Sequence, residues 1–152
     1  MKLGLVQFEP ERWNVRGNWD RLRKILSGVP EGDLDLVITS ECIIDGYVAG
    51  GAPKYPADTW PERERWLGRC ALDRLRSDII HKTANLSRRI GTYLVLGYTE
   101  LVGPGRAANA ASVFDRSGNL VATYHKTHLQ KHDLQFEPGQ ALTLVDADFG
   151  RF

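Results

Sequence analysis

The sequence has 152 residues, of which 42% are hydrophobic and 26% are charged, a composition typical of one soluble globular domain with a core of its own. Its formal net charge is +1, and the Lys and Arg residues are scattered, which gives no reason to expect nucleic acid or a membrane as a partner. The apolar runs are too short to cross a bilayer and no signal-peptide pattern stands at the N-terminus, so we expect a cytoplasmic protein. The two cysteines, Cys42 and Cys70, match neither a metal spacing nor a disulfide framework, and we expect both to be reduced.

The first part of the chain alternates strands with a helix. Residues 2–8 are apolar with little alternation, which predicts a strand buried on both faces and central in its sheet. Asn18 is expected to cap a helix that ends near Gly28. Residues 34–39 then form a second buried strand, and this strand–helix–strand order predicts two parallel, neighbouring strands.

The rest of the chain predicts one long helix and several strands. Apolar spacing indicates a helix over residues 60–89, followed by a buried strand over 93–98. Residues 111–122 predict two short strands around a turn at 116–119, and residues 142–145 begin another strand. The fold class is therefore α/β, with a mixed sheet that is parallel at first, in a single domain.

Glu41 comes just after the second strand, separated from it by Ser40, at the end where open α/β sheets form their ligand crevices. A carboxylate in a partly desolvated crevice is suited to act as a general base. A helix-capping or surface glutamate is the alternative, and position alone leaves both open. Adjacent residues leaving a strand point to opposite faces, so we expect Cys42 to be a buried structural cysteine rather than a partner of Glu41.

Lys126 stands where a β-rich run ends, flanked by His125 and His128. A strand end is a rigid place from which to aim a side chain into a cleft, and a lysine in a poorly solvated pocket can stabilise a developing oxyanion. The alternative is a solvated surface charge, which spacing alone favours because most lysines lie on the surface.

Seven short blocks of sequence follow one another along the chain. They read GLVQ at 4–7, DLVITSE at 35–41 followed by DGY at 45–47, LVLG at 94–97, NAASVFD at 109–115, SG at 117–118, YHKTHL at 124–129 and FEPG at 136–139. In content and order these blocks resemble the nitrilase superfamily of carbon–nitrogen hydrolases. The resemblance implies a four-layer αββα sandwich with helices on one face of each sheet, no cofactor, no metal, and hydrolysis of non-peptide C–N bonds by a Glu, Lys and Cys triad.

By that resemblance Glu41 is the general base and Lys126 stabilises the tetrahedral intermediate. The family's nucleophilic cysteine follows the equivalent of residues 148–152 by a few residues. We therefore expect residues 1–152 to be the N-terminal part of a C-terminally incomplete domain, inactive alone, in which neither Cys42 nor Cys70 is the nucleophile.

Two further positions depart from the family pattern. Ser40 stands where the family usually has proline. Many members also place a second glutamate between the lysine and the Pro-Gly pair, and here His132 and Asp133 are alternatives for that role.

Three functions remain open from the sequence. The first is a hydrolase of amides, N-carbamoyl compounds or nitriles, which forms a homo-oligomer when complete and lines its pocket with the loop at 45–60. The second is a non-catalytic binding or interaction module, or a half that pairs with a separate C-terminal half. The third, a nucleotide-binding α/β domain, lacks a phosphate-binding loop.

A chain that contains only half of an αββα sandwich exposes the apolar strand faces that the other half would cover. We therefore expect the isolated chain to be poorly soluble or to associate.

Overall fold

The computed structural model describes residues 1–47, 60–133 and 135–152, without the side chains of 60–64 and 132. Five strands form one sheet in the order β1-β2-β3-β4-β5. The first three strands are parallel, and β3, β4 and β5 are antiparallel, which confirms the predicted mixed sheet. Their bounds are β1 Leu3–Val6, β2 Leu36–Thr39, β3 Tyr93–Gly103, β4 Arg106–Phe114 and β5 Leu120–His125.

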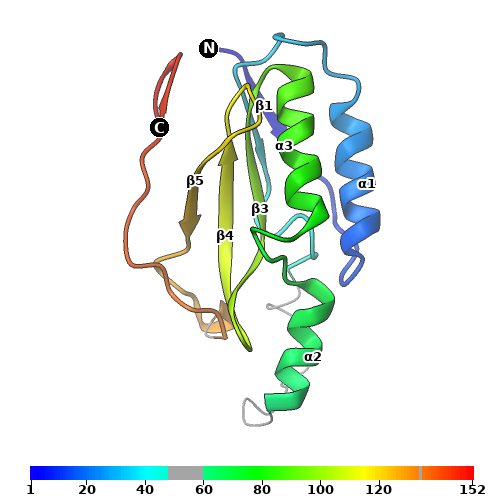
Figure 1. The fold of residues 1–152 in the computed structure, drawn as a ribbon, viewed down its shortest axis with the longest axis vertical. Helices are drawn as coiled ribbons and strands as arrows, with labels where there is room; N and C mark the ends of the chain where they lie inside the picture. The colour runs from blue at the N-terminus through cyan, green and yellow to red at the C-terminus, as the bar shows by residue number, and fades with distance from the viewer. Residues whose placement is uncertain (48–59, 134) are drawn as a thin grey trace.

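Two helices, α1 (Val15–Leu26) and α3 (Asp78–Ile90), lie side by side on one face of this sheet (Figure 1). Their apolar faces and the inner face of the sheet form one buried cluster, because apolar residues at helical spacing fall on the same side of a helix. The cluster includes Trp19, Leu22, Leu26, Ile79, Leu86, Ile90, Leu94, Leu96 and Phe114. The α/β class and the helices on one face are thus confirmed.

The predicted single helix over 60–89 is wrong. It is two helices, α2 (Trp60–Cys70) and α3, and the chain between them leaves the helical path. Leu72 pairs with β3 instead, since its N–H donates to Thr99 O at 2.8 Å. A new helix, α3, then begins at Asp78, capped by Ser77, whose hydroxyl oxygen accepts from the N–H of Ile79. Apolar spacing does not reveal this break, because an apolar residue such as Leu72 fits the face of a helix as well as the buried bridge to β3 that it forms here.

The cap of α1 is also different from the prediction. Asn14, not Asn18, is the N-cap, and its side-chain oxygen accepts from Gly17 N at 3.0 Å. Asn18 lies inside the helix and is buried. Its amide donates to Glu11 O and Ile44 O, so it fastens α1 to the segment that follows β2.

The first strand lies at the edge of the sheet, which contradicts the central position predicted for it. Its inner face joins the core through Val6, whereas Leu5 on the other face is 72% exposed. The sequence of β1 is apolar on both faces, which is compatible with burial of both. It does not show whether other residues of the chain actually cover each face. An apolar strand edge of this kind favours association.

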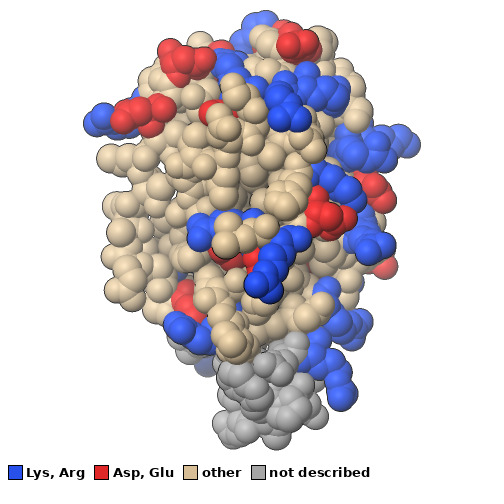
Figure 2. Space-filling model, viewed as in Figure 1, with Lys and Arg blue, Asp and Glu red and all other residues tan. Residues whose placement is uncertain are grey.

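The C-terminal segment does not form the strand predicted at 142–145. Leu142 and Leu144 are irregular in backbone and exposed, and a small hairpin of β6 (Asp146–Ala147) and β7 (Gly150–Arg151) follows them. Figure 1 shows this segment running along the side of the sheet away from the helices. In Figure 2 the middle of that edge carries few charged side chains, while Lys, Arg, Asp and Glu are interspersed over the helices.

The hairpin predicted around residues 116–119 is confirmed as the β4–β5 connection. Asp115 Oδ1 accepts from Ser117 N and Asn119 N, each at 2.8 Å, and Gly118 has a φ of +80° that few other residues adopt. Gly91 ends α3 in the left-handed conformation. None of the helices in the described ranges is long and apolar enough to cross a membrane.

Candidate functional site

Glu41 and Lys126 meet in space, although 85 positions separate them in the chain. Glu41 is the second residue after β2, and Lys126 directly follows β5. Lys126 Nζ donates to Glu41 Oε1 at 2.9 Å. The Lys126 side chain is 22% exposed, whereas that of Glu41 is 46% exposed. The two strand ends therefore hold an acid and a base together at a place that a small molecule can reach.

The backbone of Lys126 is fixed on both sides. Its N–H donates to Asn109 O on β4, and its carbonyl accepts from Gly139 N, each at 2.9 Å. Gly139 lies so close to β5 that an added Cβ would stand 2.1 Å from His125 O. The FEPG block thus has a physical reason for its glycine, because only a residue without a side chain fits against this strand end.

Asp133 completes the cluster around the lysine. It belongs to the short 3₁₀ helix η2 (Lys131–Asp133) and is fully buried. Its Oδ2 accepts from Lys126 Nζ at 2.7 Å and from Gln130 N at 3.2 Å, and its Oδ1 accepts from Tyr47 OH at 2.5 Å. Of the two alternatives left open by the sequence, Asp133 contacts the lysine, and the side chain of His132 lies outside the described residues.

The charge states of Lys126 and Asp133 follow from their contacts. Burial alone would raise the pKa of Asp133, but hydrogen bonds from Lys126, Tyr47 and Gln130 N hold that pKa below its ordinary value. Burial alone would lower the pKa of Lys126, but its bonds to Asp133 and Glu41 hold that pKa above its ordinary value. The lysine is therefore a cation and Asp133 an anion at neutral pH.

Sequence reasoning missed Tyr47. Its backbone has a φ of +52° directly after Gly46, another left-handed residue, and this turn brings its hydroxyl to Asp133. Burial and the bond to Asp133 raise the pKa of Tyr47, so the hydroxyl keeps its proton and donates it. The DGY block was the available signal, but nothing in it indicates which residue the tyrosine contacts. The predicted loop over the crevice falls largely at 48–59, outside the described residues.

Asn109 was also missed as a site residue. It is buried, and its Nδ2 donates to Glu41 Oε1 at 2.5 Å while its Oδ1 accepts from Cys42 Sγ at 3.6 Å. The signal was the NAASVFD block, which places an asparagine among small apolar residues on a buried strand. An amide there must have partners, because an unpaired buried polar group is costly.

Both cysteines are free and buried. Burial raises the pKa of Cys42 well above its ordinary value, and burial likewise raises the pKa of Cys70. Thiols of this kind are poor nucleophiles, because the thiolate is the reactive form. The prediction that Cys42 is a buried structural cysteine is confirmed.

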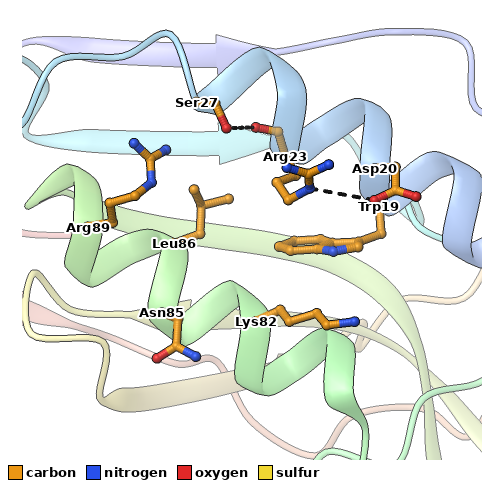
Figure 3. A pocket seen from close by; sticks show the side chains of 8 residues that line it. All are labelled: Trp19, Asp20, Arg23, Ser27, Lys82, Asn85, Leu86 and Arg89. Carbon is orange, nitrogen blue, oxygen red and sulfur yellow. Dashed lines mark hydrogen bonds and ion pairs between the residues drawn. The ribbon is translucent and has the colours of Figure 1, made fainter.

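A concavity of about 560 Å³ lies between α1 and α3, away from the cluster around Lys126 (Figure 3). Trp19 lies across it, with Arg23 and Lys82 on either side, and Arg23 pairs with Asp20 at 3.5 Å. It shares no residue with the cluster around Lys126. In the described part of the chain no group of three or more His, Cys, Asp and Glu residues could hold a metal ion.

The sequence profile of the carbon–nitrogen hydrolases matches residues 2–151. The chain belongs to the carbon–nitrogen hydrolase family. A protein of Pseudomonas protegens described as the hydrolase in the pqqF 5′ region is 28% identical to it over 133 residues, which cover 85% of this chain and 40% of that protein.

Solved structures show the same fold. Saccharomyces cerevisiae Nit3, a member of branch 10 of the nitrilase superfamily, superposes with a TM-score of 0.74 at 21% identity, over 99% of this chain and 53% of Nit3. A double mutant of the amidase from Nesterenkonia sp. AN1, in complex with acrylamide, gives a TM-score of 0.70 at 18% identity, over 95% of this chain and 51% of that amidase. The chain has the nitrilase fold and spans about half the length of these two structures.

Proposed function

We propose that residues 1–152 carry the general base, Glu41, and the oxyanion-stabilising cation, Lys126, of a hydrolase that acts on small amides, N-carbamoyl compounds or nitriles. The observation that carries this proposal is the Lys126 ammonium held between two carboxylates, at 2.9 Å from Glu41 and 2.7 Å from Asp133. An ammonium has three N–H donors, and these contacts use two. The third reaches Tyr47 OH only at 3.5 Å, so it is available for an oxyanion.

The reaction follows from these roles. A thiolate attacks the amide carbon, and Lys126 donates to the oxygen on which negative charge develops. The C–N bond then breaks as Glu41, protonated when the thiol lost its hydrogen, passes that proton to the leaving nitrogen. Glu41 next takes a proton from water as the water oxygen attacks the thioester. It then passes this proton to the departing sulfur, which restores the free thiol and the ionised Glu41. One water is consumed, and the amide becomes an acid and ammonia or an amine.

The thiol in this proposal comes from a cysteine outside residues 1–152. Cys42 and Cys70 are both buried, and the Cys42 thiol already donates to Asn109. Family membership supports the reaction class, and the acrylamide complex of the Nesterenkonia amidase supports a small amide as substrate. We further propose that the complete protein is a cytoplasmic homo-oligomer, in keeping with the two free cysteines and with the exposed apolar residues of β1.

Burial of both thiols favours a second candidate, a non-catalytic module. In that case the cluster around Lys126 would bind a small polar molecule without turnover. The chain could act so by itself, or as a half that associates with a separate C-terminal half.

Release of ammonia from a panel of amides, N-carbamoyl compounds and nitriles separates the two candidates. The protein extended through the codons that follow residue 152 in its gene should hydrolyse at least one compound class, and the 152-residue chain should hydrolyse none. Lys126→Ala should abolish the activity of the extended protein. No turnover by an extended, folded protein that contains an accessible cysteine would contradict the hydrolase and leave the binding module.

A further inference from the structure

The two oxygens of the Glu41 carboxylate have different surroundings. Oε1 accepts two hydrogen bonds, from Lys126 Nζ at 2.9 Å and from Asn109 Nδ2 at 2.5 Å. Oε2 has no hydrogen-bond partner among the residues that the structure describes. With Oε1 doubly engaged, Oε2 is the oxygen that remains able to take up a proton.

The side chain of Asn109 can face Glu41 in one orientation only. Its Oδ1 accepts from the Cys42 thiol at 3.6 Å, and both residues are buried. A carboxylate only accepts hydrogen bonds, so a flipped amide would place its oxygen against the Glu41 carboxylate and replace a hydrogen bond with a repulsive contact. The carboxylate therefore sets the orientation of the amide. The Cys42 thiol, which also lies 3.9 Å from Thr99 Oγ1, donates to the amide oxygen that faces it, and the amide in turn fixes Glu41 Oε1.

Asn109 also contacts Lys126 through its backbone. Its carbonyl accepts from Lys126 N at 2.9 Å, and it lies on β4, between β3 and β5, opposite Thr99. One residue of a central strand thus fixes the base with its side chain and the lysine with its main chain. A substitution at position 109 can keep the main-chain bond, so its effect reports on the side chain.

We infer that Asn109 is a positioning residue, which holds Glu41 Oε1 so that Oε2 is the oxygen that exchanges protons with the substrate and with water. The inference rests on the proposed function, and it adds a residue that itself touches no reacting atom. Cys42 takes part as the donor to the Asn109 amide oxygen.

Asn109→Asp tests this inference, because it keeps the shape of the side chain and replaces the donor with an oxygen. Two carboxylates so close cannot both ionise, so the pair keeps a proton to higher pH. In the extended, active protein the acidic limb of the kcat/KM profile should move up by at least about one pH unit. Asn85→Asp, at an exposed position on α3, adds the same charge and should leave the profile unchanged. If the acidic limb of the kcat/KM profile of Asn109→Asp stayed at the pH of the original protein, the inference would be overturned.

Asn109→Ala supplies a second kinetic test. Loss of the positioning bond should lower kcat by roughly 100-fold, as small misplacements of catalytic groups do, while KM changes by less than about threefold because substrate binding is not removed. Activity within about twofold of the original would count against the inference.

A double-mutant cycle examines the contact without any activity. Asn109→Ala should lower the melting temperature more when Glu41 is present than in a Glu41→Ala background, by at least about 2 °C. If the changes in melting temperature of the two single variants added up to that of the double variant, Asn109 and Glu41 would not interact, and the inference would be overturned. If the cycle shows coupling but the extended protein hydrolyses nothing, the contact stands and the proposed function, with the role of Oε2, fails.

Discussion

The ion pair of Lys126 and Asp133 gives the most quantitative prediction. Lys126→Met keeps the length of the side chain and leaves a fully buried carboxylate without its cation, which was 2.7 Å away. Removing one partner of a buried pair costs about 3–5 kcal/mol. The lysine is 22% exposed, and Asp133 keeps the bonds from Tyr47 and Gln130 N. We therefore expect the free energy of unfolding to fall by about 2–3 kcal/mol at neutral pH.

The pH dependence of this loss has a definite sign. The folded pKa of Asp133 is lowered, so its stabilisation is present above the ordinary carboxyl pKa, near about 4, and disappears as the pH falls through the folded value. The folded pKa of Lys126 is raised, so its stabilisation is complete below about pH 10 and is lost only above that. The deficit of Lys126→Met should be constant from about pH 5 to 9 and should shrink below about pH 4.

Urea unfolding of the single variants and of Lys126→Met with Asp133→Asn measures the coupling. We expect a coupling of about 1–2 kcal/mol, because the neutral amide no longer needs the cation. Additivity within about 0.5 kcal/mol would refute the reasoning. A deficit that is the same at pH 3 and pH 7 would refute it as well.

Three further predictions concern the surroundings of the site. Gly139→Ala should destabilise the fold by about 2 kcal/mol or more in urea unfolding, since the new Cβ would stand 2.1 Å from His125 O; an unchanged midpoint would contradict this contact. Cys42 and Cys70 should react with a thiol reagent only at the rate of unfolding, because both are buried, and fast reaction of either in the native chain would show that it is accessible. The 152-residue chain should associate in analytical ultracentrifugation through its apolar edge strand, and Leu5→Lys should weaken that association; a monomeric chain at all concentrations would contradict the exposed edge.

The parts of the fold that the sequence predicted well depend on local chemistry. The strands at 34–39 and 93–98 are apolar and bounded by turns, and Gly118 supplies the positive φ of the hairpin. The parts that it did not predict depend on contacts distant in the chain. Leu72 lies outside the helices because its backbone forms hydrogen bonds with β3. The spacing of apolar residues along the chain contains no information about these bonds.

The candidate site divides in the same way. Glu41 and Lys126 could be found because each follows a strand, a position that the local sequence reveals. Asn109 and Tyr47 could not, because their contacts with Glu41 and Asp133 depend on side-chain direction and on a left-handed turn. Asp133 remained one of two alternatives until the geometry of η2 placed its carboxylate on the lysine.

The most direct test of the central claim compares two glutamates in the extended protein. Glu41→Gln keeps the size of the side chain and removes the base, so kcat should fall by about 1,000-fold or more. Glu137→Gln removes the same charge from a half-exposed pair with Arg106 and should leave kcat within about twofold. If Glu41→Gln kept more than about a tenth of the original kcat, Glu41 would not be the general base.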